Sequence, residues 1–188
     1  MLEELKAYAQ DHHVPIICED GLSLIKDSIE KYGVKHILEI GTAIGYSALA
    51  MASLGCLVDT FEKDLDMIDL AKQNIDQFDK DHQINLIPFD ALDYQGELVS
   101  YDMIFIDASK AQYQRFFEKY IPYLKPSGIV ICDNLRFHDL KPENVNRHTK
   151  QLLRKIESFK KYLIDHTDFQ TIFFDLGDGM SISQRIRL

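Results

Sequence analysis

The chain has 188 residues, of which 46% are hydrophobic and 27% are charged, and its formal net charge is -9. This length fits a single domain, 1–188, and the composition excludes a disordered or fibrous protein. The negative net charge argues against indiscriminate binding to nucleic acid. Because no apolar run approaches the ~20 residues that span a bilayer and the first ten residues lack signal-peptide features, we expect a cytoplasmic protein.

Along the chain, residues 1–32 are expected to form helices that pack over the functional site or the sheet. After them, short apolar segments alternate with segments of helical periodicity. The first five apolar segments are expected to form a parallel sheet that is covered on both faces, because they are almost wholly apolar. The expected strands are 35–40, 57–62, 84–89, 101–107, 128–133, 169–176 and 180–186.

The connections between these strands predict a doubly wound fold. Leu65, Ile68, Ile75 and Phe78 are expected on one apolar helix face, and Pro126 and Gly128 are expected to form a helix stop and turn. The expected helices after residue 32 are 44–54, 64–78, 112–124 and 147–166. Only the short turn 177–179 joins the last two strands, so they must pair as an antiparallel hairpin at the sheet edge. The prediction is a Rossmann-like α/β sheet of seven mostly parallel strands with helices on both faces.

The three cysteines, Cys18, Cys56 and Cys132, are widely spaced and lie in apolar segments. An odd number at such spacing favours reduced thiols in the core over a disulfide framework or a zinc site.

A glycine turn follows the first expected strand and leads into a helix, so the backbone can approach a ligand closely there. Its spacing, from Gly41 to Gly45, lacks the middle glycine that lets a dinucleotide pyrophosphate approach. Glu62 closes the second strand 21 positions after Gly41, where an acid can accept hydrogen bonds from ribose hydroxyls. Asp90, with the Ala91 amide beside it, is suited to an adenine amino group. These residues predict an adenosine-bearing ligand; the alternative is only a tight turn.

Hard oxygen donors follow the fourth and fifth expected strands. Asp107, Asp133 and Asn134 offer two carboxylates and an amide, which suit Mg²⁺ with water and substrate completing the octahedron. Lys110, three residues beyond Asp107, is a candidate general base. The alternatives are that the acids only cap the next helices and that Lys110 is a solvated lysine at a helix start.

Several motifs together resemble the cation-dependent, catechol-type O-methyltransferases in order and spacing, across nearly the whole chain. The motifs are ILEIGTAIGYSALAMA, FEKD, FDAL, YDMIFIDASKAQY, GIVICDN and LGDGMSIS. The resemblance implies the class I methyltransferase fold, S-adenosylmethionine, a divalent cation such as Mg²⁺ and a homodimer. It assigns the cation to Asp107, Asp133 and Asn134 and the base to Lys110. The residues that it places around S-adenosylmethionine are Ile17, Glu39, Gly41, Ser47, Glu62, Asp90, Ala91 and Asp107.

The acceptor can also be read from this resemblance. HHVPI near the start and FIDASKAQYQRFF make the chain especially similar to the bacterial enzymes that methylate 5-hydroxyuridine at the tRNA wobble position. Residues 136–161 hold eight Lys or Arg residues against three acidic ones, and a helix there could follow the phosphates of the anticodon loop. The alternatives are a solvated helix face with a catechol or caffeoyl-type small substrate, and a non-catalytic module that only binds S-adenosylmethionine.

Overall fold

The computed structural model describes residues 1–136 and 146–186, and in them seven strands form one sheet in the order β3-β2-β1-β4-β5-β7-β6. All pairs from β3 to β5 are parallel, whereas β7 is antiparallel to both β5 and β6. The strands are β1 (His36–Ile40), β2 (Leu57–Glu62), β3 (Ile84–Pro88), β4 (Tyr101–Ile106), β5 (Leu124–Cys132), β6 (Phe169–Phe174) and β7 (Met180–Arg185). The predicted seven-stranded sheet and its C-terminal hairpin are confirmed.

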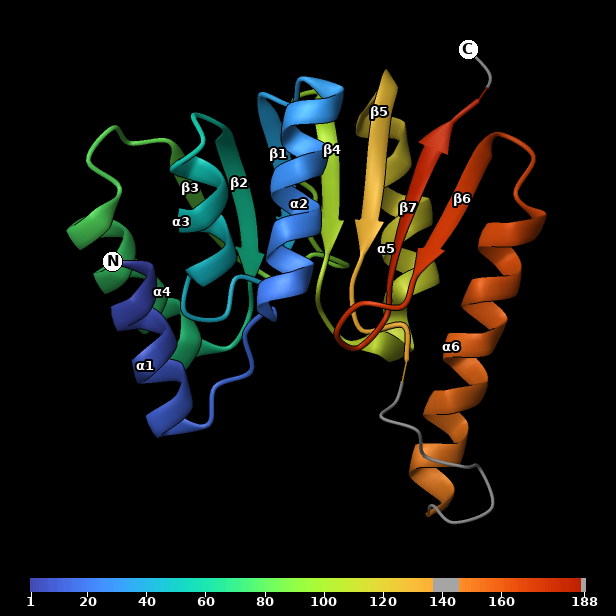
Figure 1. Cartoon of the computed structure of the whole chain (residues 1–188), viewed down its shortest axis with the longest axis horizontal. Helices are drawn as coiled ribbons and strands as arrows, with labels where there is room; N and C mark the ends of the chain where they lie inside the picture. The colour runs from blue at the N-terminus through green and yellow to red at the C-terminus, as the bar shows by residue number, and fades with distance from the viewer. Residues whose placement is uncertain (137–145, 187–188) are drawn as a thin grey trace.

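Helices cover both faces of this sheet (Figure 1). The helices are α1 (Leu2–His12), α2 (Glu19–Tyr32), α3 (Tyr46–Ala52), α4 (Leu65–Phe78), α5 (Tyr113–Tyr120) and α6 (Arg147–Asp165), with single 3₁₀ turns η1 (Lys110–Gln112) and η2 (Ile121–Tyr123). Because side chains alternate along a strand, Ile37 packs with α1, α2 and α3, while its neighbour Leu38 packs in the second cluster with α5 and α6. The sheet is thus the middle layer between two apolar cores.

Local capping explains where several helices begin. The Asp64 carboxylate accepts hydrogen bonds from the amides of Asp66 and Met67, and the Asn146 side chain accepts one from Thr149. These bonds satisfy amides that have no partner within the helix. Both helices begin at the edge of the sheet where the parallel strands end, and α6 extends beyond that edge (Figure 1).

Two expectations about the helices were wrong. Leu65 is 77% exposed and does not join the buried face of α4, because it is the first helical residue and the buried contacts of this helix begin only at Ile68. Pro126 and Gly128 lie inside β5 and do not form a helix stop and turn. The pairing of β4 with β5 shifts register just there, and this irregularity accommodates a proline that cannot donate a ladder hydrogen bond.

The three cysteines are free thiols, as expected. Cys56 and Cys132 are buried, but Cys18 is exposed, so its placement in the core was wrong. Cys18 instead caps α2, where its sulfur accepts a hydrogen bond from the Gly21 amide.

In residues 1–136 and 146–186 we find no helix with the length and apolar character needed to cross a membrane.

Candidate active site

A cavity of about 670 Å³ opens at the carboxyl ends of the parallel strands. Open α/β sheets bind their ligands at this edge. All the residues predicted to contact a cofactor or metal line it, except Glu39. The predicted residues at the cavity wall are Ile17, Gly41, Ser47, Glu62, Asp90, Ala91, Asp107, Lys110, Asp133 and Asn134.

The turn after β1 needs a glycine at position 41 for two reasons. Gly41 has a φ of +107°, and a Cβ atom there would overlap the carbonyl oxygen of Asp107. The amides of Gly41 and Thr42 both donate to the Phe61 carbonyl oxygen, at 3.0 and 3.1 Å. The turn is therefore fixed between the ends of β2 and β4, and its backbone forms the floor of the cavity.

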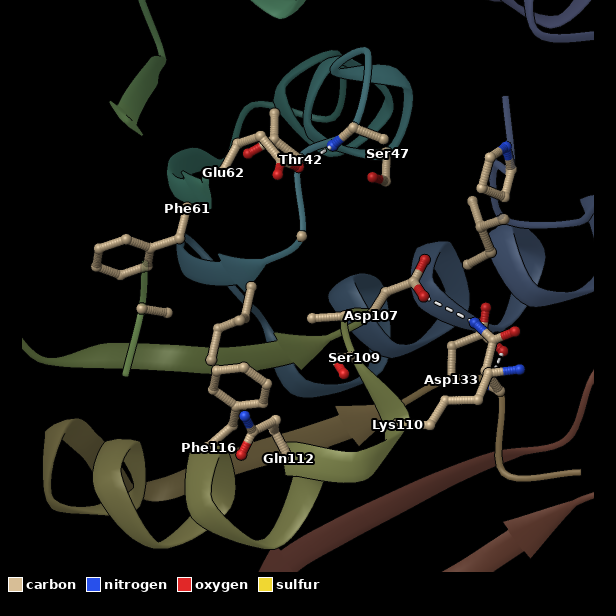
Figure 2. A pocket seen from close by; sticks show the side chains of 18 of the residues that line it. Thr42, Ser47, Phe61, Glu62, Asp107, Ser109, Lys110, Gln112, Phe116 and Asp133 are labelled. Carbon is tan, nitrogen blue, oxygen red and sulfur yellow. Dashed lines mark hydrogen bonds between the residues drawn. The ribbon is translucent and has the colours of Figure 1, made fainter. Parts of the chain in front are cut away.

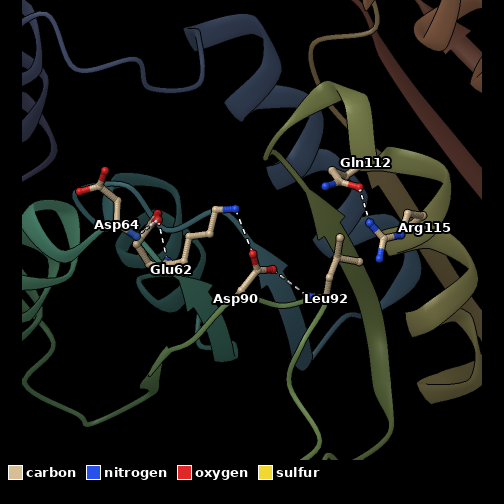
Figure 3. A network of polar contacts seen from close by, with 7 residues as sticks. Glu62, Asp64, Asp90, Leu92, Gln112 and Arg115 are labelled. Atoms are coloured by element: carbon tan, nitrogen blue, oxygen red, sulfur yellow. Dashed lines mark hydrogen bonds and ion pairs between the residues drawn. The ribbon is translucent and has the colours of Figure 1, made fainter.

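Glu62 and Asp90 lie on one side of the cavity with their carboxylates already partly hydrogen-bonded (Figure 3). Glu62 accepts from the amides of Ala43, Lys63 and Asp64 at 2.8 to 3.0 Å. Asp90 accepts from the Leu92 amide and pairs with the Lys63 ammonium at 3.0 Å. The Leu92 amide, followed by Lys63, holds the pKa of Asp90 below its usual value. Both side chains thus offer carboxylate oxygens as hydrogen-bond acceptors at the wall of the cavity.

Glu39 lies beneath this floor and contacts the cavity only through other side chains. Its two carboxylate oxygens accept hydrogen bonds from the Ser47 and Thr60 hydroxyls, both at 2.5 Å. Thr60 is in turn hydrogen-bonded to Thr42 at 2.6 Å. Since Thr42 lies within the glycine turn and Ser47 lies just after it, and both line the cavity, Glu39 fixes the turn to the helix that follows.

Glu39 makes the stability of the protein depend on pH. Its burial raises its pKa from 4.5 to about 7, against the opposing effect of the Ser47 and Thr60 hydrogen bonds. Because the folded state then binds the proton more tightly than the unfolded state, this group should lower stability as pH rises from about 4.5 to about 7. Glu39→Gln should flatten this dependence in thermal unfolding at pH 5 and pH 7.5 with a chelator present. An unchanged difference between the two melting temperatures would contradict this assignment.

Asp107, Asp133 and Asn134 meet at the ends of β4 and β5, on the side of the cavity away from Glu62 (Figure 2). The Asn134 amide nitrogen donates to Asp107 at 2.7 Å, and its backbone amide donates to Asp133 at 2.6 Å. Asn134 has a φ of +61°, a left-handed conformation that asparagine tolerates better than most residues. This corner brings all three predicted metal ligands together.

The electrostatics of this corner fit a divalent cation. Burial raises the pKa of Asp107 to about 7 and that of Asp133 to about 6, and the charge of Asp133 raises the pKa of Asp107 further. Two neighbouring carboxylates that repel each other and are partly shielded from water are stabilised by a cation between them. Within the described ranges there is no cluster of three or more His, Cys, Asp or Glu side chains suited to a metal, so the third protein oxygen would be that of Asn134. Rotating the Asn134 side-chain amide by half a turn would exchange its nitrogen and oxygen and direct the oxygen toward a cation at this corner.

Lys110 begins η1 and lines the cavity beside the same corner (Figure 2). Its positive charge lowers the pKa of both Asp107 and Asp133, which places its ammonium group near each carboxylate. The side chain therefore lies within electrostatic range of the proposed metal ligands, as the spacing along the chain predicted.

Some residues of the site were missed in the sequence. Lys63 pairs with Asp90, and Gly177 and Asp178 of the hairpin turn line the cavity, with Gly177 next to the Cys18 side chain. The hairpin turn also holds the corner, since its carbonyl oxygens at Asp178 and Gly179 accept hydrogen bonds from the amides of Arg136 and Leu135. Two features of the sequence could have indicated these residues. Lys63 directly follows Glu62, and two glycines flank Asp178 in the turn.

Known proteins are similar to this chain in both sequence and fold. The O-methyltransferase family profile matches residues 1–186. Tapetum-specific methyltransferase 1 of Arabidopsis thaliana is 32% identical over 81% of this chain and 70% of its own length. A catechol O-methyltransferase of Niastella koreensis is 30% identical over 79% of this chain and 72% of its own length.

A solved structure agrees closely with this one. A Staphylococcus aureus protein assigned as a caffeoyl-CoA O-methyltransferase has a TM-score of 0.93 and 39% identity, covering 98% of this chain and 91% of its own. The O-methyltransferase from Bacillus cereus, solved in complex with SAH, shares the fold with a TM-score of 0.81 at 21% identity, covering 98% of this chain and 90% of its own. The family match over nearly the full length, together with the cavity at the strand ends, shows that the chain belongs to the O-methyltransferase family.

Proposed function

We propose that this O-methyltransferase, which transfers the methyl group of S-adenosylmethionine, depends on Mg²⁺ and methylates the 5-hydroxyl of 5-hydroxyuridine at the wobble position of tRNA. The observation that carries the metal-dependent part is the pair of half-buried Asp107 and buried Asp133 at the cavity wall. The observation that favours a nucleic acid is the basic helix α6 beside the site.

The cavity has suitable groups for the methyl donor at one end. A carboxylate has about four lone-pair sites, and Glu62 uses three of them on backbone amides, which leaves one for a ribose hydroxyl. Asp90 can accept from an adenine amino group beside Lys63. Ser47, held by Glu39, and Asp107 lie further along the wall, toward the metal corner, and suit the amino acid portion of the donor.

The chemistry needs one proton transfer and one methyl transfer. A divalent cation held by Asp107, Asp133 and Asn134 would make the bound hydroxyl of an acceptor with two neighbouring oxygens more acidic. Lys110, in its neutral form, takes the proton of that hydroxyl. The acceptor oxygen then forms a bond to the methyl carbon as the bond from that carbon to sulfur breaks, and S-adenosylhomocysteine leaves. The protein contributes mainly by aligning the two reactants.

The position of α6 supports a nucleic acid as the acceptor. Arg147, Arg154 and Lys155 are exposed on this helix, and its N-terminal turns extend past the sheet edge where the cavity opens (Figure 1). The helix also packs against η1, which carries Lys110. A phosphate chain bound on α6 would therefore pass close to the site. Residues 137–145 of the predicted basic segment lie outside the described residues.

Salt dependence tests this acceptor. Binding of tRNA that contains 5-hydroxyuridine should weaken steeply as salt rises, because each neutralised phosphate releases counterions. Replacing Arg147, Arg154 and Lys155 together with Gln should lower the slope of log affinity against log salt by about three and weaken binding at least about tenfold. Equal replacement of the exposed lysines Lys26, Lys31 and Lys72, which lie outside this helix, is the matched control. A labelled methyl group that never reaches the tRNA would reject this acceptor.

A small catechol or caffeoyl-type molecule is the second candidate, since the Niastella koreensis relative is named a catechol O-methyltransferase. Methylation of such a substrate should hardly respond to salt or to the α6 replacements. The alternative of a non-catalytic binding module is set aside by membership of an enzyme family. The proposal also includes a cytoplasmic location, where tRNA is found, and a homodimer.

A further inference from the structure

Two neighbouring residues of α5 hold the loop after β3, which forms one wall of the cavity. The Tyr120 hydroxyl donates to the carbonyl oxygen of Ala91 at 2.6 Å, and both residues are buried. The Lys119 ammonium donates to the carbonyl oxygens of Leu92 and Tyr94, at 2.7 and 2.8 Å. Three backbone carbonyls of this loop are therefore bound by two side chains of one helix.

The same loop carries two polar groups at the cavity wall. Asp90 accepts hydrogen bonds from the Leu92 amide and from Lys63, and its carboxylate has room for a further donor (Figure 3). The Ala91 amide has no acceptor among the residues that the structure describes. An acceptor beside a donor matches the edge of adenine at which the 6-amino group donates and the ring nitrogen N1 accepts.

Lys119 is held at this loop although its position costs free energy. The side chain is half-buried, and burial lowers the pKa of its ammonium, against the charges of two nearby aspartates that raise it. Ordering a long lysine side chain also costs conformational entropy, which its two charge-assisted hydrogen bonds offset. The rings of Tyr120 and Tyr94 both pack against Phe61, with 5.8 and 5.0 Å between ring centres. The loop is thus fixed through its backbone as well as its side chains.

We infer that Lys119 and Tyr120 are positioning residues, which hold the loop after β3 so that the Asp90 carboxylate and the Ala91 amide bind the adenine ring of the methyl donor. Neither Lys119 nor Tyr120 lines the cavity, so both act through the loop. The inference rests on the proposed function in one respect, because Asp90 is assigned to the adenine amino group there. It depends on neither the cation nor the acceptor.

A purely structural role predicts a different outcome. If these hydrogen bonds only stabilise the fold, removing them lowers the melting temperature and leaves the preference of the site among purine rings unchanged. S-inosylhomocysteine separates the two roles, because it differs from S-adenosylhomocysteine only in its purine ring. Its 6-oxo group accepts and its N1 donates, so it opposes both Asp90 and the Ala91 amide. The informative quantity is the ratio of the two dissociation constants.

The test is calorimetric titration of the intact protein with each compound, in buffer that contains Mg²⁺. The wild type should bind S-inosylhomocysteine at least about 30-fold more weakly, because the mismatched ring leaves polar groups of the site unpaired. Lys119→Met and Tyr120→Phe should each weaken binding of S-adenosylhomocysteine about 3- to 10-fold, the usual effect of losing such hydrogen bonds. Each should also lower the ratio of dissociation constants at least about threefold.

Two variants at the other end of the sheet are the matched controls. Lys125→Met removes an ammonium that pairs with Asp102 at 2.8 Å, and Tyr101→Phe removes a buried hydroxyl that donates to Asp59 at 2.7 Å. Both replaced residues lie at the starts of their strands, away from the cavity. These controls should lower the melting temperature and leave both dissociation constants unchanged.

Two results would overturn the inference, and they differ. A ratio that stays at the wild-type value in Lys119→Met or Tyr120→Phe, whatever the melting temperature, would reject the positioning role of the residue replaced and leave the proposed function standing. A wild type that binds the two compounds equally well would reject the assignment of Asp90 to the adenine amino group, and the inference with it.

Discussion

Replacing Asp133 with Asn should lower kcat at least about 10³-fold, which corresponds to losing about 4 kcal/mol of transition-state stabilisation. Asn keeps the size of the side chain and removes the negative charge that the buried corner contributes to a cation. Asp133 is only 5% exposed, so water cannot replace that charge easily. The measurement is transfer of labelled methyl groups at saturating Mg²⁺, with either the tRNA or a catechol as acceptor.

The same substitution should leave methyl donor binding unaffected. Glu62 and Asp90, which face the adenosine end of the cavity, do not contact Asp133, so the dissociation constant of S-adenosylmethionine should change less than about twofold. Asp76→Asn, at an exposed position on α4, is the matched control and should keep full activity. Full activity in Asp133→Asn would contradict the role of this carboxylate.

Replacing Lys110 with Met should lower kcat about 10² to 10⁴-fold, the usual contribution of a general base. Met keeps the length of the aliphatic side chain and cannot accept a proton. The loss should shrink for an acceptor whose hydroxyl is more acidic, such as a nitrocatechol, because the base is then needed less. The comparison is therefore the ratio of wild-type to variant kcat across catechols of increasing acidity.

Binding measurements separate this effect from damage to the metal corner. Lys110→Met should bind Mn²⁺ at least as tightly as the wild type, since it removes a positive charge near Asp107 and Asp133. Lys110→Arg keeps that charge but is a poor base, so it should remain as inactive as Lys110→Met. A ratio of rates that stays constant across the catechol series would assign Lys110 to substrate positioning and contradict its role as the base.

The sequence predicted the sheet well because its strands are short, apolar and separated by clear helical periods. The antiparallel hairpin followed from the length of a single turn, and each of the seven predicted strands overlaps an observed one, although β5 begins at Leu124 and not at residue 128. Pro126 and Gly128 were wrongly expected to end a helix, because they commonly do so in the local sequence. The register shift that accommodates them within β5 comes from pairing with β4, which the local sequence does not show. Leu65 was misplaced for a similar reason, since a helical period cannot show where the core ends.

The sequence predicted the polar and charged side chains of the site, but it predicted fewer of the contacts that hold them in place. Asp107, Asp133 and Asn134 could be found because polar side chains at the ends of apolar strands stand out. Glu39 was assigned to the cofactor by resemblance, but its contacts to Ser47 and Thr60 place it beneath the cavity. The two glycines of the hairpin turn indicated a turn, but its contacts with Leu135 and Arg136 join chain segments that meet only in the folded protein, so the sequence could not indicate them.

The central claim is that Asp107, Asp133 and Asn134 bind one divalent cation inside the methyl donor cavity. Crystals of the protein grown with Mn²⁺ and S-adenosylhomocysteine, with diffraction recorded at a wavelength where manganese scatters anomalously, test it most directly. We predict one strong anomalous peak enclosed by the oxygens of these three side chains, on the Lys110 side of the cavity. A map with no peak there, or with manganese bound only elsewhere, would contradict the account.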